Sequence, residues 1–285
     1  MLIYGRHFKF RQLAKAASVV AGAMSPLFIR ALGKGFLTAF EFSAHMRELY
    51  HDLAENDPIP VVTISERSAN FLRGQEIWVD LSEPATAISA AELAYICSLV
   101  KAQDPRLVVE IGTYRGFTTL HLSRNTADSC QIFTVDLPPE SAKGAPFYSD
   151  SHLVKACGAM PRVFGNDPKI TQILKDSTTI NWEQVLNAPI DFAFIDGSHL
   201  YEHVRKDTEG IMKALAPKGV VVWHDYFAVE IRRGVRKYLN ELYRNGLPLW
   251  RIAGTALCVY ARNHVNRSAT DQRSCGRARG EVGRC

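Results

Sequence analysis

Between residues 85 and 261, short continuous apolar runs alternate with longer stretches whose apolar residues recur at helical spacing. The runs have the length of buried strands, and the stretches have the length of helices. Predicted strands occupy 107–111, 131–135, 170–174, 190–195, 220–223, 249–253 and 256–260, and predicted helices occupy 90–102 after the cap residue Ser89, 117–125, 151–159, 202–215 and 231–243. Strands that alternate with helices form a parallel sheet covered on both faces. We therefore expect a doubly wound α/β domain whose ligand crevice lies outside the carboxyl ends of the strands.

Two flanking segments differ in pattern from this domain. Residues 1–84 predict a helical N-terminal extension over 8–50 and then a linker or lid with a short strand at 77–79. Residues 262–285 are rich in Arg, Gly and Ser without an apolar period, which predicts a disordered tail. The apolar run at 16–29 is shorter than the roughly 20 residues of a spanning helix, so a helical cap on the domain and a membrane-surface helix are the alternatives there.

The net charge of +5 belongs to the ends of the chain. Residues 1–50 carry a net charge of +5 and residues 262–285 a net charge of +4, which leaves −4 for residues 51–261. An acidic body offers no surface for a polyanion, so nucleic acid is not an expected partner. The six cysteines are widely spaced without a CxxC pair, which argues against a zinc site or a disulfide framework and favours a reducing, cytoplasmic setting.

The predicted strand 107–111 runs from an acidic residue into a turn bounded by glycines, Glu110-Ile-Gly112-Thr-Tyr-Arg-Gly116. Gly112 permits a tight turn and close approach of a ligand, and Gly116 lies where the next helix points its free amide groups into the crevice. The G-x-x-x-G spacing lacks the second glycine of a dinucleotide site, which disfavours a pyrophosphate ligand. The carboxylate of Glu110 could hold a cationic ligand. An ordinary strand-to-helix turn is the alternative.

Two further acids follow predicted strands. Asp136 ends the strand 131–135 and could accept both ribose hydroxyls of a nucleoside in the same crevice as Glu110. Asp176, with Ser177 next to it, could accept a hydrogen bond from an adenine amino group. The alternatives are a turn residue for Asp136 and a helix cap for Asp176.

The buried strand 190–195 delivers Asp196 to the crevice, and His199 follows closely enough to face the same space. An unperturbed histidine has a pKa near 6.5, so it can take a proton from an acceptor hydroxyl at neutral pH. We therefore expect His199 and Asp196 to be catalytic, with Asp196 also beside the cofactor. The alternative is that His199 caps the following helix.

His224 and Asp225 follow the strand 220–223, next to Asp196. Two carboxylates and an imidazole could bind a divalent cation, Mg²⁺ or Mn²⁺, which would orient an acceptor oxygen and lower its pKa. Mg²⁺ usually takes an all-oxygen ligand set. The presence of His224 therefore leaves a second alternative, in which a hydrogen-bonded Asp225 shapes the pocket without a metal.

Four segments together resemble a known family: Glu110–Gly116, Phe194–Tyr201, Leu215–Gly219 and Trp223–Tyr226. They are similar to class I S-adenosylmethionine (SAM) dependent methyltransferases of methyltransferase family 24, and thereby to sugar and macrolide O-methyltransferases and, more distantly, to catechol O-methyltransferase. The resemblance implies a Rossmann-like sheet of seven strands with an antiparallel last strand. It covers the predicted domain, and it covers neither residues 1–80 nor the tail.

The resemblance also implies roles for residues. SAM would be held by Asp136 and by the turn after the first strand, which consists of Glu110, Gly112, Thr113, Tyr114 and Gly116. Acceptor chemistry would take place around Asp196, His199 and Asp225. Metal-dependent relatives carry an acidic or amide residue at both positions that match His224 and Asp225, so His224 departs from their pattern.

These residues favour O-methylation of a hydroxyl on a small-molecule or sugar-containing acceptor, with His199 as the general base. A nucleic-acid methyltransferase that uses the basic termini is one alternative, and it predicts salt-dependent binding. An NAD-dependent oxidoreductase on the same sheet architecture is another, because a fold alone does not decide function. The sequence leaves open a SAM-binding protein without transferase activity and a homo-oligomer.

Overall fold

The computed structural model describes residues 58–62, 76–80, 88–142, 167–226 and 233–262. The chain divides into two compact units, 1–57 and 58–285, and all of the described residues belong to the second unit. The helices expected within 8–50 and at 151–159, and the tail from residue 263 onward, lie outside the described residues.

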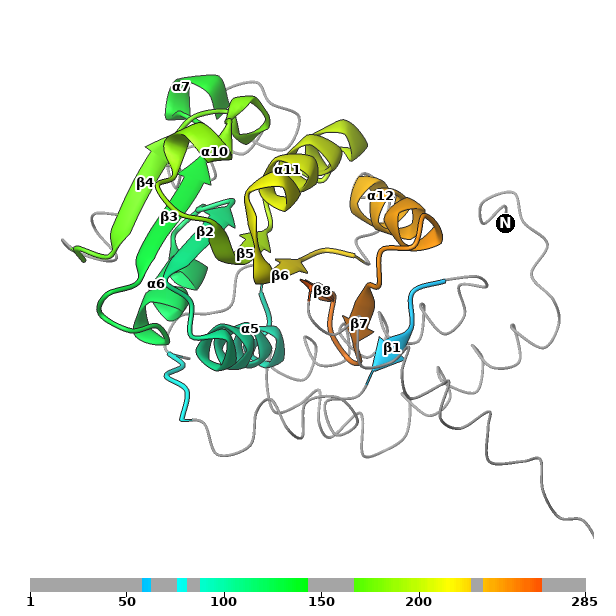
Figure 1. Ribbon diagram of the computed structural model, residues 1–285, viewed down its shortest axis with the longest axis horizontal. Coiled ribbons are helices and arrows are strands. Elements are labelled where there is room, and N and C mark those ends of the chain that lie inside the picture. Colours follow the sequence, from blue (N-terminus) through cyan, green and yellow to red (C-terminus); the bar gives the residue numbers. More distant parts are fainter. Residues whose placement is uncertain (1–57, 63–75, 81–87, 143–166, 227–232, 263–285) are drawn as a thin grey trace, which may run out of the picture. The chain divides into compact units, whose positions relative to one another are not determined.

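A mixed sheet of eight strands forms the centre of this unit (Figure 1), in the order β1-β7-β8-β6-β5-β2-β3-β4. The strands are β1 (Val61–Val62), β2 (Leu107–Ile111), β3 (Gln131–Asp136), β4 (Ile170–Leu174), β5 (Ile190–Ile195), β6 (Leu215–Trp223), β7 (Trp250–Ile252) and β8 (Cys258–Ala261). Strands β2, β3, β4, β5 and β6 run parallel to one another, whereas β8 is antiparallel to both β6 and β7. The expected α/β sheet with an antiparallel last strand is therefore confirmed.

Strand β1 adds an eighth strand to the expected seven. Val61 and Val62 pair in parallel with Arg251 and Ile252 of β7. The amide of Arg251 also donates a hydrogen bond to the carbonyl oxygen of Pro60 at 2.9 Å. A strand of two residues is too short to show an apolar period, which explains why the sequence predicted a linker there.

The segment 76–80, where the sequence predicted a short strand, is not a strand. It is instead bound to the helix that follows β2. The side-chain amide of Asn125 accepts a hydrogen bond from the backbone of Trp78 and donates one back, both at 2.8 Å. The Nε2 atom of His121 accepts a hydrogen bond from the amide of Asp80 at 2.9 Å.

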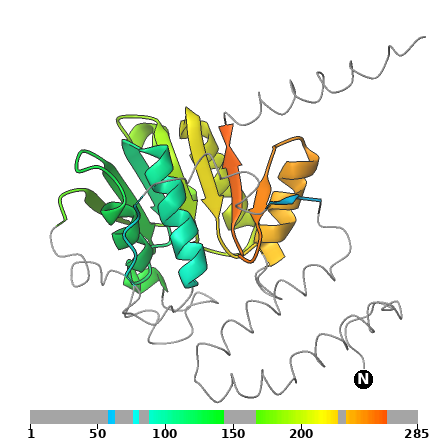
Figure 2. The ribbon, with the colours of Figure 1, turned by 90° about the horizontal axis from the view of Figure 1, so that it is seen from below.

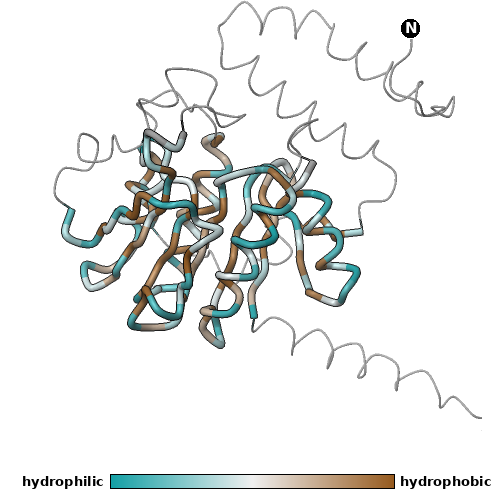
Figure 3. The backbone as a smooth tube through the Cα atoms, turned by 90° about the horizontal axis from the view of Figure 1, so that it is seen from above, coloured by the Kyte–Doolittle hydropathy of each residue, from teal (hydrophilic) through white to brown (hydrophobic). Residues whose placement is uncertain are grey.

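Helices cover both faces of the sheet (Figure 2). They are α5 (Ala90–Gln103), α6 (Phe117–Arg124), α7 (Pro139–Ala142), α10 (Trp182–Val185), α11 (Tyr201–Ala214) and α12 (Arg233–Arg244), with a 3₁₀ turn η1 (Ser177–Thr179). Ile96 of α5 and Leu122 of α6 belong to one apolar core, and Trp182 of α10, Val204 of α11 and Leu239 of α12 belong to the other. Figure 3 shows the apolar residues concentrated along the strands between these two layers. Within the described residues, no helix combines the length and apolarity needed to cross a membrane.

Helix α5 begins at the cap that the sequence predicted. The hydroxyl of Ser89 accepts a hydrogen bond from the amide of Glu92 at 3.2 Å, and the carboxylate of Glu92 accepts one from the amide of Ser89 at 2.9 Å. This reciprocal pair is a capping box, which satisfies amide groups that the first helical turn leaves without partners.

Strand register brings four strand ends to one level. Ile111 of β2 pairs with Val135 of β3 and with Ile195 of β5, and Ile195 pairs with Trp223 of β6. The residues that follow these positions therefore lie at one edge of the sheet. This edge is the crevice that the sequence predicted at the carboxyl ends of parallel strands.

Asp207 is a buried acid on the opposite side of α11 from solvent, with 1% of its surface exposed. Burial raises its pKa from 3.8 to about 7, and the negative charge of Asp176 adds to this effect. A carboxyl group with a higher pKa in the folded state binds its proton more tightly when folded. Its contribution to stability is therefore complete below pH 3.8 and is lost as the pH rises to 7 and above.

We expect Asp207→Asn to stabilise the protein relative to the wild type by an amount that grows by on the order of 2 kcal/mol between pH 5 and pH 8. Urea unfolding at both pH values measures this difference. Asp128→Asn, at an exposed carboxylate, is the control and should leave the pH dependence unchanged. A wild-type pH dependence that persists in Asp207→Asn would rule out this origin.

Candidate functional site

The turn after β2 brings the backbones of β2 and β5 into contact. Gly112 has a φ of +102°, and a Cβ atom at this position would overlap the carbonyl oxygen of Asp196. Glycine alone meets both constraints. Gly116 has a φ of +76° at the start of α6, and its amide donates a hydrogen bond to the carbonyl oxygen of Thr113 at 2.7 Å. The two predicted glycines therefore give the turn its shape.

Glu110 is fully buried at the end of β2. Its Oε2 atom accepts hydrogen bonds from the hydroxyls of Thr119 on α6 and Thr134 on β3, the second at 2.6 Å. The Thr134 hydroxyl also shares a hydrogen bond of 2.6 Å with Thr113. Burial raises the pKa of Glu110 to about 8 against the effect of these hydroxyls, and Oε1 has no hydrogen-bond partner among the described residues. A buried acceptor atom of this kind suits a donor group of a ligand.

Asp136 ends β3, the strand next to Glu110. Its Oδ2 atom accepts a hydrogen bond from the amide of Tyr114 at 2.7 Å, and its Oδ1 atom accepts one from the amide of Leu137 at 2.8 Å. Tyr114 has a φ of +49°, which is unfavourable for a residue other than glycine. The bond to Asp136 therefore stabilises the turn. A carboxylate has about four lone-pair sites, so the acceptor capacity exceeds these two amides.

Asp176 and Ser177 follow β4, which is the edge strand and is separated from β5 by β3 and β2. The Oδ1 atom of Asp176 accepts hydrogen bonds from the amide and the hydroxyl of Thr178, at 3.0 and 2.8 Å, and so caps the turn η1. This capping role is the alternative that was predicted for Asp176. The adenine contact of Asp176 and Ser177 stays a prediction.

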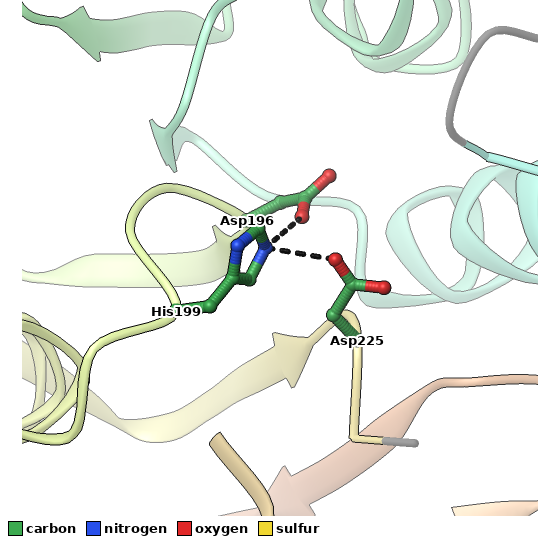
Figure 4. Close-up of side chains that lie close together, drawn as sticks. All are labelled: Asp196, His199 and Asp225. Atoms are coloured by element: carbon green, nitrogen blue, oxygen red, sulfur yellow. Dashed lines mark ion pairs between the residues drawn. The ribbon is translucent and has the colours of Figure 1, made fainter. Parts of the chain in front are cut away.

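Asp196, His199 and Asp225 come together at the ends of β5 and β6 (Figure 4). The Nε2 atom of His199 lies 2.7 Å from Oδ2 of Asp225 and 3.9 Å from Oδ1 of Asp196. Asp225 has a φ of +57°, so the chain turns sharply after β6 and the carboxylate points toward His199. The side chains of Asp196 and His199 are 16% exposed and that of Asp225 is 9% exposed, so this cluster is shielded from bulk water.

Burial and neighbouring charges have opposite effects on the pKa values of this cluster. Burial lowers the pKa of His199, but hydrogen bonds and charge from Asp196 and Asp225 outweigh it and hold the pKa above its ordinary value of 6.5. Burial raises the pKa of Asp225, but His199 and His224 hold it well below its usual range. Asp225 is therefore ionised at neutral pH and orients the ring of His199.

Helix α12 lies directly against the loop that carries His199. A Cβ atom at Gly234 would overlap the carbonyl oxygen of His199 and the amide nitrogen of Tyr201. The hydroxyl of Tyr201 donates a hydrogen bond to Glu241 of α12 at 2.5 Å. Gly234 was not among the predicted site residues, although a glycine inside a predicted helix is a signal of close packing.

His224 lies behind the cluster, buried between three carboxylates. Its Nδ1 atom is 3.3 Å from Oδ1 of Asp196 and 3.6 Å from Oδ1 of Asp225, and its Nε2 atom is 3.5 Å from Oε2 of Glu92 on α5. Burial lowers the pKa of His224, but these carboxylates raise it well above 6.5. Burial raises the pKa of Glu92, but His224 and backbone amides lower it to about 2. Glu92 was not among the predicted site residues, because its position three residues after Ser89 signals a helix cap and nothing more.

The ligand atoms of this cluster test whether the site suits a divalent cation, which was one of the two alternatives predicted for Asp225. Ligand atoms of Asp196, His199 and Asp225 lie within 4.8 Å of one another, close enough to share an ion. Mg²⁺ prefers oxygen ligands in an octahedral shell. Here each oxygen of Asp225 faces a histidine nitrogen, and both nitrogens of His224 face carboxylates. This set does not fit the all-oxygen site that the resemblance implies for metal-dependent relatives, because Asp225 is already in ion-pair contact with His199 and His224.

Comparison with curated proteins gives two partial matches. An uncharacterized protein of Sinorhizobium fredii, y4gI, is 30% identical over 149 residues, which are 50% of this chain and 16% of that protein. The catechol O-methyltransferase of Mycobacterium tuberculosis is 36% identical over 62 residues, which are 22% of this chain and 28% of that enzyme. The matches therefore span less than a third of either relative.

Among solved structures, the O-methyltransferase of Bacillus cereus in complex with S-adenosylhomocysteine (SAH) gives a TM-score of 0.43 at 20% identity, over 62% of this chain and 84% of that one. Residues 109–226 match the family described as Methyltransferase domain. This range includes every strand end described above, from β2 to the residues that follow β6. Residues 109–226 are therefore similar to the methyltransferase domain family that the sequence motifs predicted.

Proposed function

We propose that this protein transfers a methyl group from SAM to a hydroxyl oxygen of a small-molecule or sugar-containing acceptor. The observation that carries the proposal is the shielded pair of His199 and Asp225, with its 2.7 Å contact, at the same sheet edge as Glu110 and Asp136. A candidate base and candidate nucleoside-binding residues thus lie together at the carboxyl ends of the parallel strands, an edge of the sheet that we call the rim. The family match and the partial match to a catechol O-methyltransferase support the same reaction class.

The residues at the ends of β2 and β3 fit SAM, which supplies an electrophilic methyl group on a sulfonium and also carries an ammonium group and a ribose. Asp136 would accept hydrogen bonds from ribose hydroxyls in addition to those from the amides of Tyr114 and Leu137. The buried Oε1 atom of Glu110 offers an acceptor for a donor group, and a nearby cation would favour the ionised form of this acid. Gly112 and Gly116 let the backbone of the turn lie close to the ligand.

His199 would remove the proton of the acceptor hydroxyl. With Nε2 of His199 at 2.7 Å from the carboxylate of Asp225, the proton of neutral His199 would lie on Nε2 and the proton-accepting nitrogen would be Nδ1. As the acceptor oxygen forms its bond to the methyl carbon, the carbon–sulfur bond breaks and the hydroxyl proton moves to Nδ1. Asp225 and Asp196 would stabilise the imidazolium that forms, much as a buried carboxylate does in other histidine bases.

Two alternatives have less support. An NAD-dependent oxidoreductase needs close approach of a pyrophosphate at the turn after β2, where Tyr114 occupies a position with a φ of +49° in place of a glycine. A nucleic-acid methyltransferase would depend on the basic termini, which lie outside the described residues apart from Arg262.

SAH binding tests the cofactor part of the proposed function. SAH should bind the wild-type chain and raise its melting temperature, whereas NAD should not, because only a ligand of the native state stabilises it. Asp136→Asn should weaken SAH binding by roughly 10- to 100-fold, the range expected for lost hydrogen bonds to a charged group. Isothermal titration calorimetry measures both affinities.

Asp128→Asn is the control for this measurement and should bind SAH as the wild type does. Asp176→Asn tests the predicted adenine contact separately, and an unchanged affinity would remove Asp176 from the cofactor site. Wild-type protein that binds NAD and ignores SAH would contradict the proposed function.

Methyl transfer by a variant of His199 tests the proposed general base. His199→Ala should lower the methyl-transfer rate by roughly 10²- to 10⁴-fold while SAH affinity stays within about twofold, because the loss falls on proton transfer. Transfer of radiolabelled methyl groups from SAM to catechol and to a methyl glucoside provides the assay.

The wild-type rate should rise with pH through a midpoint above 6.5, since His199 accepts a proton only in its neutral form and its pKa is raised. His203→Ala, one turn into α11, is the control and should keep this profile. Equal rates for His199→Ala and wild type across the pH range would exclude His199 as the base.

A further inference from the structure

The carboxylates of Glu92, Asp196 and Asp225 surround the ring of His224, whose side chain is only 3% exposed. Three negative charges in a buried space repel one another and lose their hydration. They remain ionised together only if a positive charge lies between them. The one side chain that contacts all three in the described part of the chain is His224.

The two sides of the His224 ring face different carboxylates. Nδ1 faces Asp196 and Asp225 on the side of the site, and Nε2 faces Glu92 on the side of α5. A neutral imidazole donates from one nitrogen and presents a lone pair at the other, and that lone pair would face a carboxylate oxygen. Only the doubly protonated ring is a donor on both sides.

Glu92 is fixed in place independently of His224. Its Oε1 atom accepts a hydrogen bond from the amide of Ala256 at 2.7 Å, and its Oε2 atom accepts hydrogen bonds from the amide and the hydroxyl of Ser89 at 2.9 and 2.8 Å. Glu92 therefore holds a negative charge at a set position behind His224, close to the start of α5, where the helix dipole also favours a carboxylate.

On the basis of the proposed function, we infer that Glu92 and His224 form a built-in cationic support that holds Asp196 and Asp225 at the rim in place of a divalent ion. Glu92 is then a positioning residue, which acts on the site through His224. The charges agree with this role, because protonated His224 places a positive charge between Glu92, Asp196 and Asp225, where a divalent ion would otherwise offset their repulsion. Methyl transfer by this chain accordingly needs no added metal.

The test begins with metal binding, which does not depend on catalysis. The full chain, treated with EDTA and dialysed, is titrated with Mn²⁺ and followed by electron paramagnetic resonance. Wild-type protein should show no bound Mn²⁺ at this cluster, whereas His224→Asn, which removes the cation and offers an amide oxygen, should bind one ion. Stoichiometric Mn²⁺ binding by the wild type that Asp196→Asn abolishes would overturn the inference.

The second part measures methyl transfer. EDTA-treated wild type should keep its rate, and added Mg²⁺ should change that rate by less than about twofold. His224→Asn should be slow without metal and should recover with Mg²⁺ or Mn²⁺. A wild-type rate that EDTA abolishes and Mg²⁺ restores would also overturn the inference.

The third part isolates Glu92, in case His224→Asn does not fold. Glu92→Gln keeps the size of the side chain but removes its charge, and kcat should fall by on the order of 10- to 100-fold while KM for SAM and SAH affinity stay unchanged. Thr208→Ala is the matched control, because it removes a buried hydrogen bond of 3.0 Å to Trp223 on the other side of β6 without touching the carboxylates. An equal loss of kcat in both variants would show that Glu92 serves stability alone.

These outcomes separate the inference from the proposed function. A wild type that binds neither SAH nor an acceptor would refute the methyltransferase assignment. The comparison of Mn²⁺ binding between wild type and His224→Asn would still decide whether His224 occupies the place of a cation.

Discussion

Acidic side chains at the carboxyl ends of neighbouring parallel strands lie close together at the buried rim. Polar contacts in this region offset the electrostatic repulsion between these side chains. The offset differs along the rim. Glu110 is surrounded by threonine hydroxyls and has a pKa raised to about 8. Asp136 is held by two backbone amides. Asp196 and Asp225 have histidines as neighbours. The rim therefore contains, in the spatial order β3, β2, β5 and β6, a hydrogen-bonded acid, a neutralised acid and a pair of acids next to histidines.

The backbone of two turns next to the rim also has an unusual conformation, which helps to order these acids. Residues other than glycine rarely adopt positive φ, yet Tyr114 and Asp225 do so at the two turns that flank the rim. In each case the unusual conformation directs a group toward the site, the amide of Tyr114 to Asp136 and the carboxylate of Asp225 to His199. The strain is therefore located where it orders polar groups, and the regular strands between these turns provide the rigid support.

The sequence predicted the strands and most of the rim because both depend on local signals. Apolar runs bounded by helices locate β2, β3, β5 and β6, and the residue after each run lies at the crevice by the rule for parallel sheets. Glu92 was missed because its contact with His224 joins residues more than 130 positions apart, and nothing local to α5 indicates it. Strand β1 was missed because two residues carry no period. Strand β6 begins at Leu215, before the predicted strand 220–223, because Leu215 also pairs with Ile190 of β5, and the register shifts between this pair and Val220.

The position of β1 bears on how this protein can be divided into fragments. Ile59 is 1% exposed, and its carbonyl oxygen accepts a hydrogen bond from the Nε atom of Arg251 at 3.0 Å. Val62 accepts a further backbone hydrogen bond from Ala253 at 3.1 Å. A fragment that starts at residue 85 would leave the outer side of β7 bare and prone to pairing with other chains. Expression of the α/β unit as a separate piece would therefore have to begin at or before Pro58.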